Sequence, residues 1–114
     1  MNSLYRVSIN YNALNRIIKG EKTIEGRIKK GIFRTINKGD IIQFHNRDIN
    51  CLTKIVNIIE YGDILEYLSG ENLNNIIPNK SREDILNIYK KYYPNILNNS
   101  KEFLAIQIKL IHNL

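Results

Sequence analysis

A lysine, a glutamate and an arginine stand close together in the segment from Gly20 to Arg27, which reads Gly-Glu-Lys-Thr-Ile-Glu-Gly-Arg. In a regular strand, Glu25 and Arg27 share a face because they are two residues apart. Lys22 and Glu25 are three apart and point to opposite faces unless the backbone turns or bulges between them. A carboxylate can accept a hydrogen bond from a base amine while a neighbouring cation binds phosphate. The same pair could instead supply a general base or nucleophile, or a purely structural ion pair.

This segment lies in a basic window from Arg16 to Lys38, which holds eight lysine or arginine residues and two acids. The window's net charge of +6 equals that of the whole chain, so the positive excess is local. A local positive field concentrates a polyanion on one face of a protein. The candidate nucleic-acid contacts are therefore Lys19, Lys22, Thr23, Glu25, Arg27, Lys29, Lys30 and Arg34.

The stretch after Arg27 is predicted to be a basic loop around Gly31. It is either a solvated surface or a segment that follows a nucleic-acid backbone. Phe33 lies between Lys30 and Arg34, where an aromatic ring could stack on a base. Filling one end of the hydrophobic core is the alternative role for this ring.

Length and composition exclude several classes of protein. A chain of 114 residues predicts one domain, residues 1–114. No apolar run is long enough for a membrane span, and no signal-peptide pattern is present. The single cysteine, Cys51, predicts a buried apolar side chain and an intracellular location, cytoplasmic or nuclear. The few, widely spaced His and Cys residues predict no metal site, and we expect no cofactor.

The surrounding pattern indicates the elements that hold the segment in place. Alternating apolar residues predict strands over 4–9, 23–28, 41–45, 51–59 and 103–111. Helices are predicted behind Asn10 or Asn12, behind Asp63 and behind Ser81. The order predicts an α+β fold, a small β-barrel of about five to six strands with inserted helices. We expect the last strand to be central and to close the barrel by pairing with the first.

The sequence predicts two different roles for the tyrosines. Those of the last helix are predicted to pack that helix against the barrel: Tyr89, Tyr92 and Tyr93. Those expected to line a cleft are Tyr5, Tyr11 and Tyr61.

Taken together, the motif Gly-x-Lys-Thr-x-Glu-x-Arg, formed by Gly20 to Arg27 after a short helix, resembles the ASCH domain, a branch of the PUA-like superfamily. The Lys-Gly-Asp strand entry at 38–40 and the closing helix and strand at 88–94 and 103–106 also fit. The resemblance covers almost the whole chain. It implies a PUA-like β-barrel that binds RNA or a modified nucleotide in a basic cleft beside the motif.

The resemblance also implies alternatives to simple binding. Some small members are amidohydrolases that deacetylate N4-acetylcytidine, with a lysine and, three residues on, a threonine. Lys22 matches that lysine, but Glu25 stands at the threonine position, and the nearest candidate partner acid is Glu71. The form with Glu25 is similar to the branch described as RNA-binding. If the protein is an enzyme, an amidohydrolase or a ribonuclease, Lys22 and Glu25 are the predicted catalytic residues; a module that binds an acidic protein partner is the third alternative.

Overall fold

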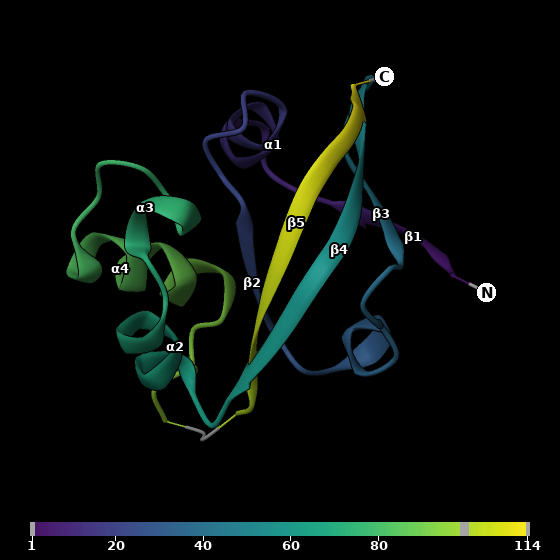
Figure 1. Ribbon diagram of the computed structural model, residues 1–114. Coiled ribbons are helices and arrows are strands. Elements are labelled where there is room, and N and C mark those ends of the chain that lie inside the picture. The colour runs from purple at the N-terminus through teal and green to yellow at the C-terminus, as the bar shows by residue number, and fades with distance from the viewer. Residues whose placement is uncertain (1, 99–100, 114) are drawn as a thin grey trace.

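The computed structural model describes residues 2–98 and 101–113 and has an α+β fold (Figure 1). Five strands form one curled sheet, a half-barrel with helices inserted between the strands. The elements in chain order are β1 (Leu4–Ser8), α1 (Tyr11–Ile18), β2 (Ile24–Ile28), the 3₁₀-helix η1 (Gly31–Arg34), β3 (Ile41–Asn46), β4 (Ile49–Tyr61), α2 (Ile64–Gly70), α3 (Leu73–Ile76), α4 (Arg82–Tyr92) and β5 (Phe103–Asn113).

The strand order in the sheet is β1-β3-β4-β5-β2, with β1 parallel to β3 and every other pair antiparallel. The expected central position of β5 is confirmed, because it pairs with β4 on one side and with β2 on the other. The predicted pairing of the last strand with the first is wrong. β4 and β2 occupy the two edges of β5. β1 pairs with β3 instead, so β1 and β2 are the edge strands of the sheet. Two register shifts in the β4–β5 pair accompany the curl of these long strands.

Helices α1, α2 and α4 begin behind the predicted capping residues, and α3 adds a short helix between α2 and α4. Each starts after a residue whose side chain accepts a backbone N–H of the first turn: Asn10, Asp63, Asn72 and Ser81. Such a cap stabilises a helix by about 1 kcal/mol. The loop expected around Gly31 is instead one turn of 3₁₀-helix, η1, entered through Gly31 with a φ of 59°.

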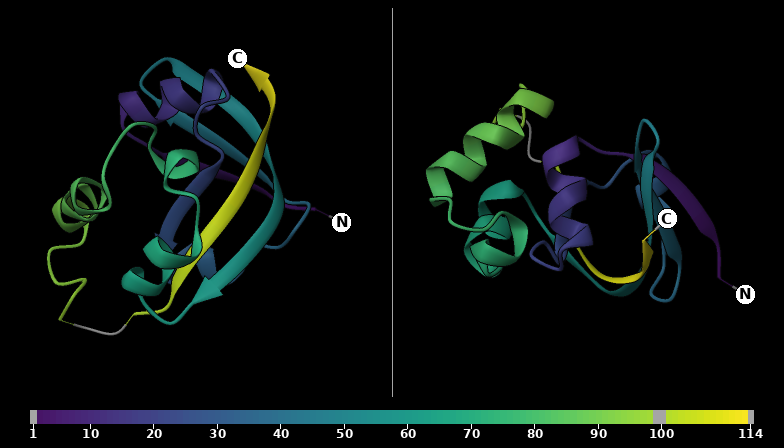
Figure 2. Two further views of the ribbon diagram at one scale, coloured as in Figure 1. Left: turned by 60° about the vertical axis from the view of Figure 1, so that its left-hand side comes forward. Right: turned by 90° about the horizontal axis from the view of Figure 1, so that it is seen from above.

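The apolar side chains form two cores on the two sides of β2 and β5. The first lies inside the curl, where α1 covers one end of the sheet (Figure 2), and it includes Leu14, Phe44 and the fully buried Cys51. The second lies between the sheet and α2, α3 and α4, and it includes Tyr67, Tyr89 and Phe103. Because β2 runs between the two cores, its side chains are held from both sides.

Candidate functional site

A turn after α1 brings Lys22 into the protein interior. Gly20 ends the helix with a φ of 77°, a conformation that glycine adopts without strain. The backbone N–H groups of Glu21 and Lys22 then both donate to the carbonyl oxygen of Arg16, at 2.9 and 3.1 Å. This turn is what allows Lys22 and Glu25, three residues apart, to meet on one side of the chain.

The Lys22 ammonium group has three hydrogens and three acceptors around it. Its Nζ lies 2.6 Å from the carbonyl oxygen of Ile24, 3.1 Å from that of Ile76 in α3, and 3.3 Å from Oε1 of Glu25. The side chains of Lys22 and Glu25 are only 4% and 8% exposed. This is therefore a buried ion pair whose lysine also donates hydrogen bonds to two backbone carbonyl oxygens.

Arg27 is the outermost member of the same network. Its Nε donates to Oε2 of Glu25 at 2.8 Å, which confirms that the two side chains share a face. Its Nη2 donates a long hydrogen bond of 3.5 Å to the carbonyl oxygen of Ser8, so the side chain links the edge strands β2 and β1. The guanidinium carbon also lies 5.1 Å from the centre of the Phe33 ring, within cation–π range. The Arg27 side chain remains 22% exposed, whereas those of Lys22 and Glu25 are buried. Arg27 is therefore the one charged group of these three that reaches the surface.

The charges of the network determine how its members titrate. Burial lowers the pKa of Lys22, and the attraction of Glu25 offsets only part of this effect. Burial by itself would raise the pKa of Glu25, but the positive charges of Lys22 and Arg27 hold it below its ordinary value of 4.5. The folded protein therefore binds a proton at Glu25 less readily than the unfolded chain does.

This difference predicts a loss of stability in acid. The contribution of Glu25 is complete above its unfolded pKa of 4.5 and is lost as the pH falls through the lower folded pKa. Urea denaturation between about pH 3 and pH 7 should show the free energy of unfolding falling below about pH 4.5. The neutral double variant Lys22→Met/Glu25→Gln should lose part of this acid dependence, whereas Glu66→Gln, at an exposed carboxylate, serves as the control. An unchanged pH profile in the double variant would contradict the prediction.

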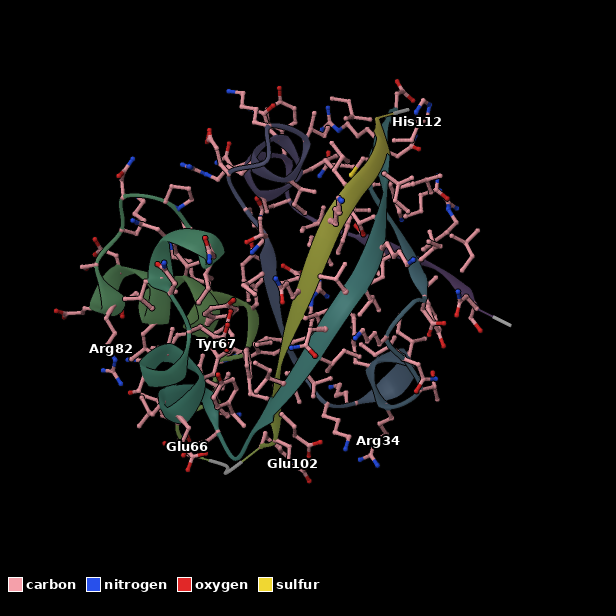
Figure 3. The ribbon with its side chains drawn as sticks, in the orientation of Figure 1. Arg34, Glu66, Tyr67, Arg82, Glu102 and His112 are labelled. Carbon is pink, nitrogen blue, oxygen red and sulfur yellow. The ribbon has the colours of Figure 1, made fainter. Side chains whose placement is uncertain are left out.

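Gly26 lies between the two charged residues of β2 and leaves room for two tyrosine hydroxyls. A Cβ atom at this position would lie 2.5 Å from Oη of Tyr67 and would also overlap Oη of Tyr89. These hydroxyls bond each other at 2.8 Å in the second core (Figure 3 labels Tyr67). The sequence analysis did not predict this contact. A glycine inside a strand is nevertheless a recognised signal that another group approaches the backbone closely.

The remaining exposed cations predicted to bind lie beyond the two ends of β2 rather than in one cluster. Lys19 is exposed at the end of α1. Lys30 is exposed just before η1 and Arg34 is exposed at its last position, and α1 and η1 lie at opposite ends of β2 (Figure 1). Arg34 projects outward at the end of the molecule that also holds Glu102 (Figure 3). Within residues 2–98 and 101–113, none of these three cations forms an ion pair.

Two further predicted contacts are already engaged within the protein. Lys29 Nζ lies 2.9 Å from Glu60 and 3.8 Å from Glu102, in exposed ion pairs. Thr23 bonds through its backbone, with its N–H donating to Asn75 and its carbonyl accepting from Ile108, both at 2.9 Å. These bonds fix the start of β2 between α3 and β5.

Glu71, the nearest candidate for a partner acid, bonds to the hydroxyl of Tyr61. The part of the chain that the structure describes brings together no group of three His, Cys, Asp or Glu side chains able to hold a metal ion. No helix in that part has the length and apolar character to span a membrane.

Comparison with known proteins places this fold in a family. Residues 7–112 match the family model of the ASCH domain. The crystal structure of hypothetical protein PH0355 is similar, with 28% identity and a TM-score of 0.83, over 95% of this chain and 99% of that one. The solution structure of protein PF0455 from Pyrococcus furiosus has 27% identity and a TM-score of 0.74, over 95% and 97% of the two chains.

More distant structures share the fold. An ASCH protein from Zymomonas mobilis has 15% identity and a TM-score of 0.63, over 96% of this chain and 71% of that one. Among curated proteins, none matches. The match over residues 7–112, together with the curled sheet and the inserted helices, shows that this chain belongs to the ASCH domain family.

Proposed function

We propose that this ASCH domain binds RNA or a nucleotide-like anion, with Arg27 as the central anion contact. The observation that most strongly supports this proposal is the orientation of the Arg27 side chain. Glu25 holds its Nε at 2.8 Å, and the guanidinium group lies partly exposed between the edge strands β1 and β2. A guanidinium fixed on one side presents its remaining N–H donors in the fork that matches phosphate oxygens.

In this proposal the buried residues position Arg27 and the exposed ones attract the ligand. Both oxygens of Glu25 are engaged, one by Lys22 and one by Arg27, so Glu25 acts mainly by orienting Arg27. Lys30 and Arg34 supply longer-range attraction from η1, and Lys19 does so from the end of α1. Lys29 contributes less to such a field, because Glu60 and Glu102 lie beside it.

The geometry favours binding over the two enzymatic alternatives. A lysine that serves as nucleophile or general base needs a free lone pair facing the substrate. The Nζ of Lys22 is buried among three acceptors, and Glu71 is bonded to Tyr61. We therefore expect little or no hydrolysis of N4-acetylcytidine or of RNA. Turnover at ordinary enzymatic rates that Lys22→Ala abolishes would replace the binding proposal with the enzymatic one.

RNA binding should be weak, micromolar or weaker, and should depend steeply on salt, because each phosphate contact with a single strand adds about 0.7 to the slope of log K against log salt. The double variant Lys30→Ala/Arg34→Ala should reduce that slope by up to about 1.4. Arg27→Ala should weaken binding by about 1–3 kcal/mol, the value of a charged hydrogen bond to the ligand. Fluorescence anisotropy of labelled RNA over a salt series measures both effects.

The matched control removes two positive charges elsewhere. Lys54 and Lys109 are exposed, lie opposite each other in the β4–β5 pair, and are not among the candidate nucleic-acid contacts. If Lys54→Ala/Lys109→Ala lowers the slope as much as Lys30→Ala/Arg34→Ala, binding reflects net charge only. Binding of an acidic protein partner that RNA does not displace would favour the protein-interaction alternative.

A further inference from the structure

Three side chains from distant elements bind three consecutive residues at the junction between β1 and α1. Arg27 of β2 donates to the carbonyl oxygen of Ser8, and Asn46 of β3 donates through Nδ2 to that of Ile9 at 2.8 Å. The Nδ2 of the next residue, Asn10, donates to the hydroxyl of Tyr92, at the end of α4, also at 2.8 Å. These bonds place Arg27, Asn46 and Tyr92 around one short junction of the chain.

Two exposed tyrosines lie on this surface. Tyr92 is 58% exposed, although it was predicted to pack α4 against the barrel, and Tyr11, which follows Asn10, is 54% exposed. Tyr89 of the same helix and Tyr93 directly after it do pack into the second core, which accounts for the packing of α4 without Tyr92. Because Asn10 both caps α1 and binds the Tyr92 hydroxyl, the Tyr92 ring is held in a defined orientation at the surface.

The neighbouring charges favour an anionic ligand. Arg27 lies close to Tyr93, the residue that follows Tyr92, and the exposed Lys91 precedes Tyr92 in α4. On the other side, Tyr11 borders a shallow depression that Arg47 and Asp48 also line, and these two charges balance. The charges named around the two tyrosines therefore sum to a net positive charge.

We propose that Tyr92 and Tyr11 form a stacking platform for bases of single-stranded RNA whose phosphate contacts Arg27. This inference rests on the proposed function and adds the strand type and the base-binding residues. Aromatic side chains beside a cationic groove bind single strands by stacking, whereas the bases of a duplex are stacked on one another and unavailable. Because Tyr92 is already hydrogen-bonded to Asn10 in the free protein, less conformational entropy is lost when its ring is immobilised against a base.

The test measures binding of a short labelled single-stranded RNA, and of the matching duplex, to the full chain and its variants. Tyr92→Ala and Tyr11→Ala should each lower the affinity for the single strand by about 5- to 150-fold, the range for loss of one stacked base. Their salt slopes should stay unchanged because no charge is lost. Tyr92→Phe keeps the ring and should retain most of the affinity. Leu65→Ala, at a 40% exposed apolar residue of α2, is the control and should have no effect.

The outcomes separate this inference from the proposed function. If RNA binds and Arg27→Ala weakens it while the tyrosine variants bind normally, the platform is excluded and the proposed function stands. Equal affinity for duplex and single strand also excludes the platform. If the unaltered protein binds no RNA even at low salt, both proposals fall.

Discussion

Replacing Lys22 by methionine should lower the free energy of unfolding by about 3–5 kcal/mol, the typical effect of breaking a buried ion pair. The change removes the donor to the carbonyl oxygens of Ile24 and Ile76 and one of the two partners of Glu25. Methionine fills a similar volume, so the loss reflects the polar contacts rather than a cavity. Urea denaturation at neutral pH, followed by circular dichroism, measures it.

Lys29→Met provides a matched control for that experiment. Lys29 pairs with Glu60 at 2.9 Å, a shorter distance than the 3.3 Å between Lys22 and Glu25, but both side chains are exposed. An exposed pair contributes at most about 1 kcal/mol, because water screens the charges. Similar losses in the two variants would show that burial of the Lys22–Glu25 pair does not have the energetic role assigned to it.

A double-mutant cycle tests whether the two buried charges act as one unit. In Lys22→Met/Glu25→Gln no carboxylate is left beside an absent lysine, and the amide of residue 25 can still accept from Arg27. The double variant should therefore be less destabilised than the sum of the two single variants. Additive losses would mean that Lys22 and Glu25 contribute independently.

The second large effect is expected from Gly26→Ala, which should destabilise the protein by about 2–4 kcal/mol through overpacking and a broken buried hydrogen bond. The added methyl group would overlap the hydroxyls of Tyr67 and Tyr89, so one ring must move. Moving either ring breaks the 2.8 Å bond between the two hydroxyls and disturbs their packing on Phe103. Thermal and urea denaturation measure the loss.

A rescue experiment identifies the cause. Removing both hydroxyls in Tyr67→Phe/Tyr89→Phe leaves no unpaired partner and makes room for a methyl group at residue 26. Gly26→Ala should therefore destabilise this double-phenylalanine background much less than it destabilises the natural chain. An equal loss in both backgrounds would place the strain in the backbone of β2 and not in the tyrosine contact.

Local sequence signals were sufficient for most of the elements. Asn10, Asp63 and Ser81 cap helices because a side-chain oxygen three residues before a free N–H can reach it wherever the helix lies in the fold. Glu25 and Arg27 share a face because side chains of a strand repeat every two residues. The motif from Gly20 to Arg27 together with the order of the elements predicted the ASCH family, and the match over residues 7–112 confirms the family.

The tertiary structure alone decided the contacts that give the candidate site its character. The second carbonyl bound by Lys22 belongs to Ile76, more than fifty residues further along the chain, and Arg27 reaches back to Ser8. The pairing of β5 with β2, the approach of Tyr67 and Tyr89 to Gly26, and the exposure of Tyr92 likewise depend on how distant elements pack. Periodicity and capping determine which way a side chain points within its own element. They do not determine which other element lies there, because that depends on the path of the whole chain, and this is why the sequence indicated Lys22, Glu25 and Arg27 but not their partners.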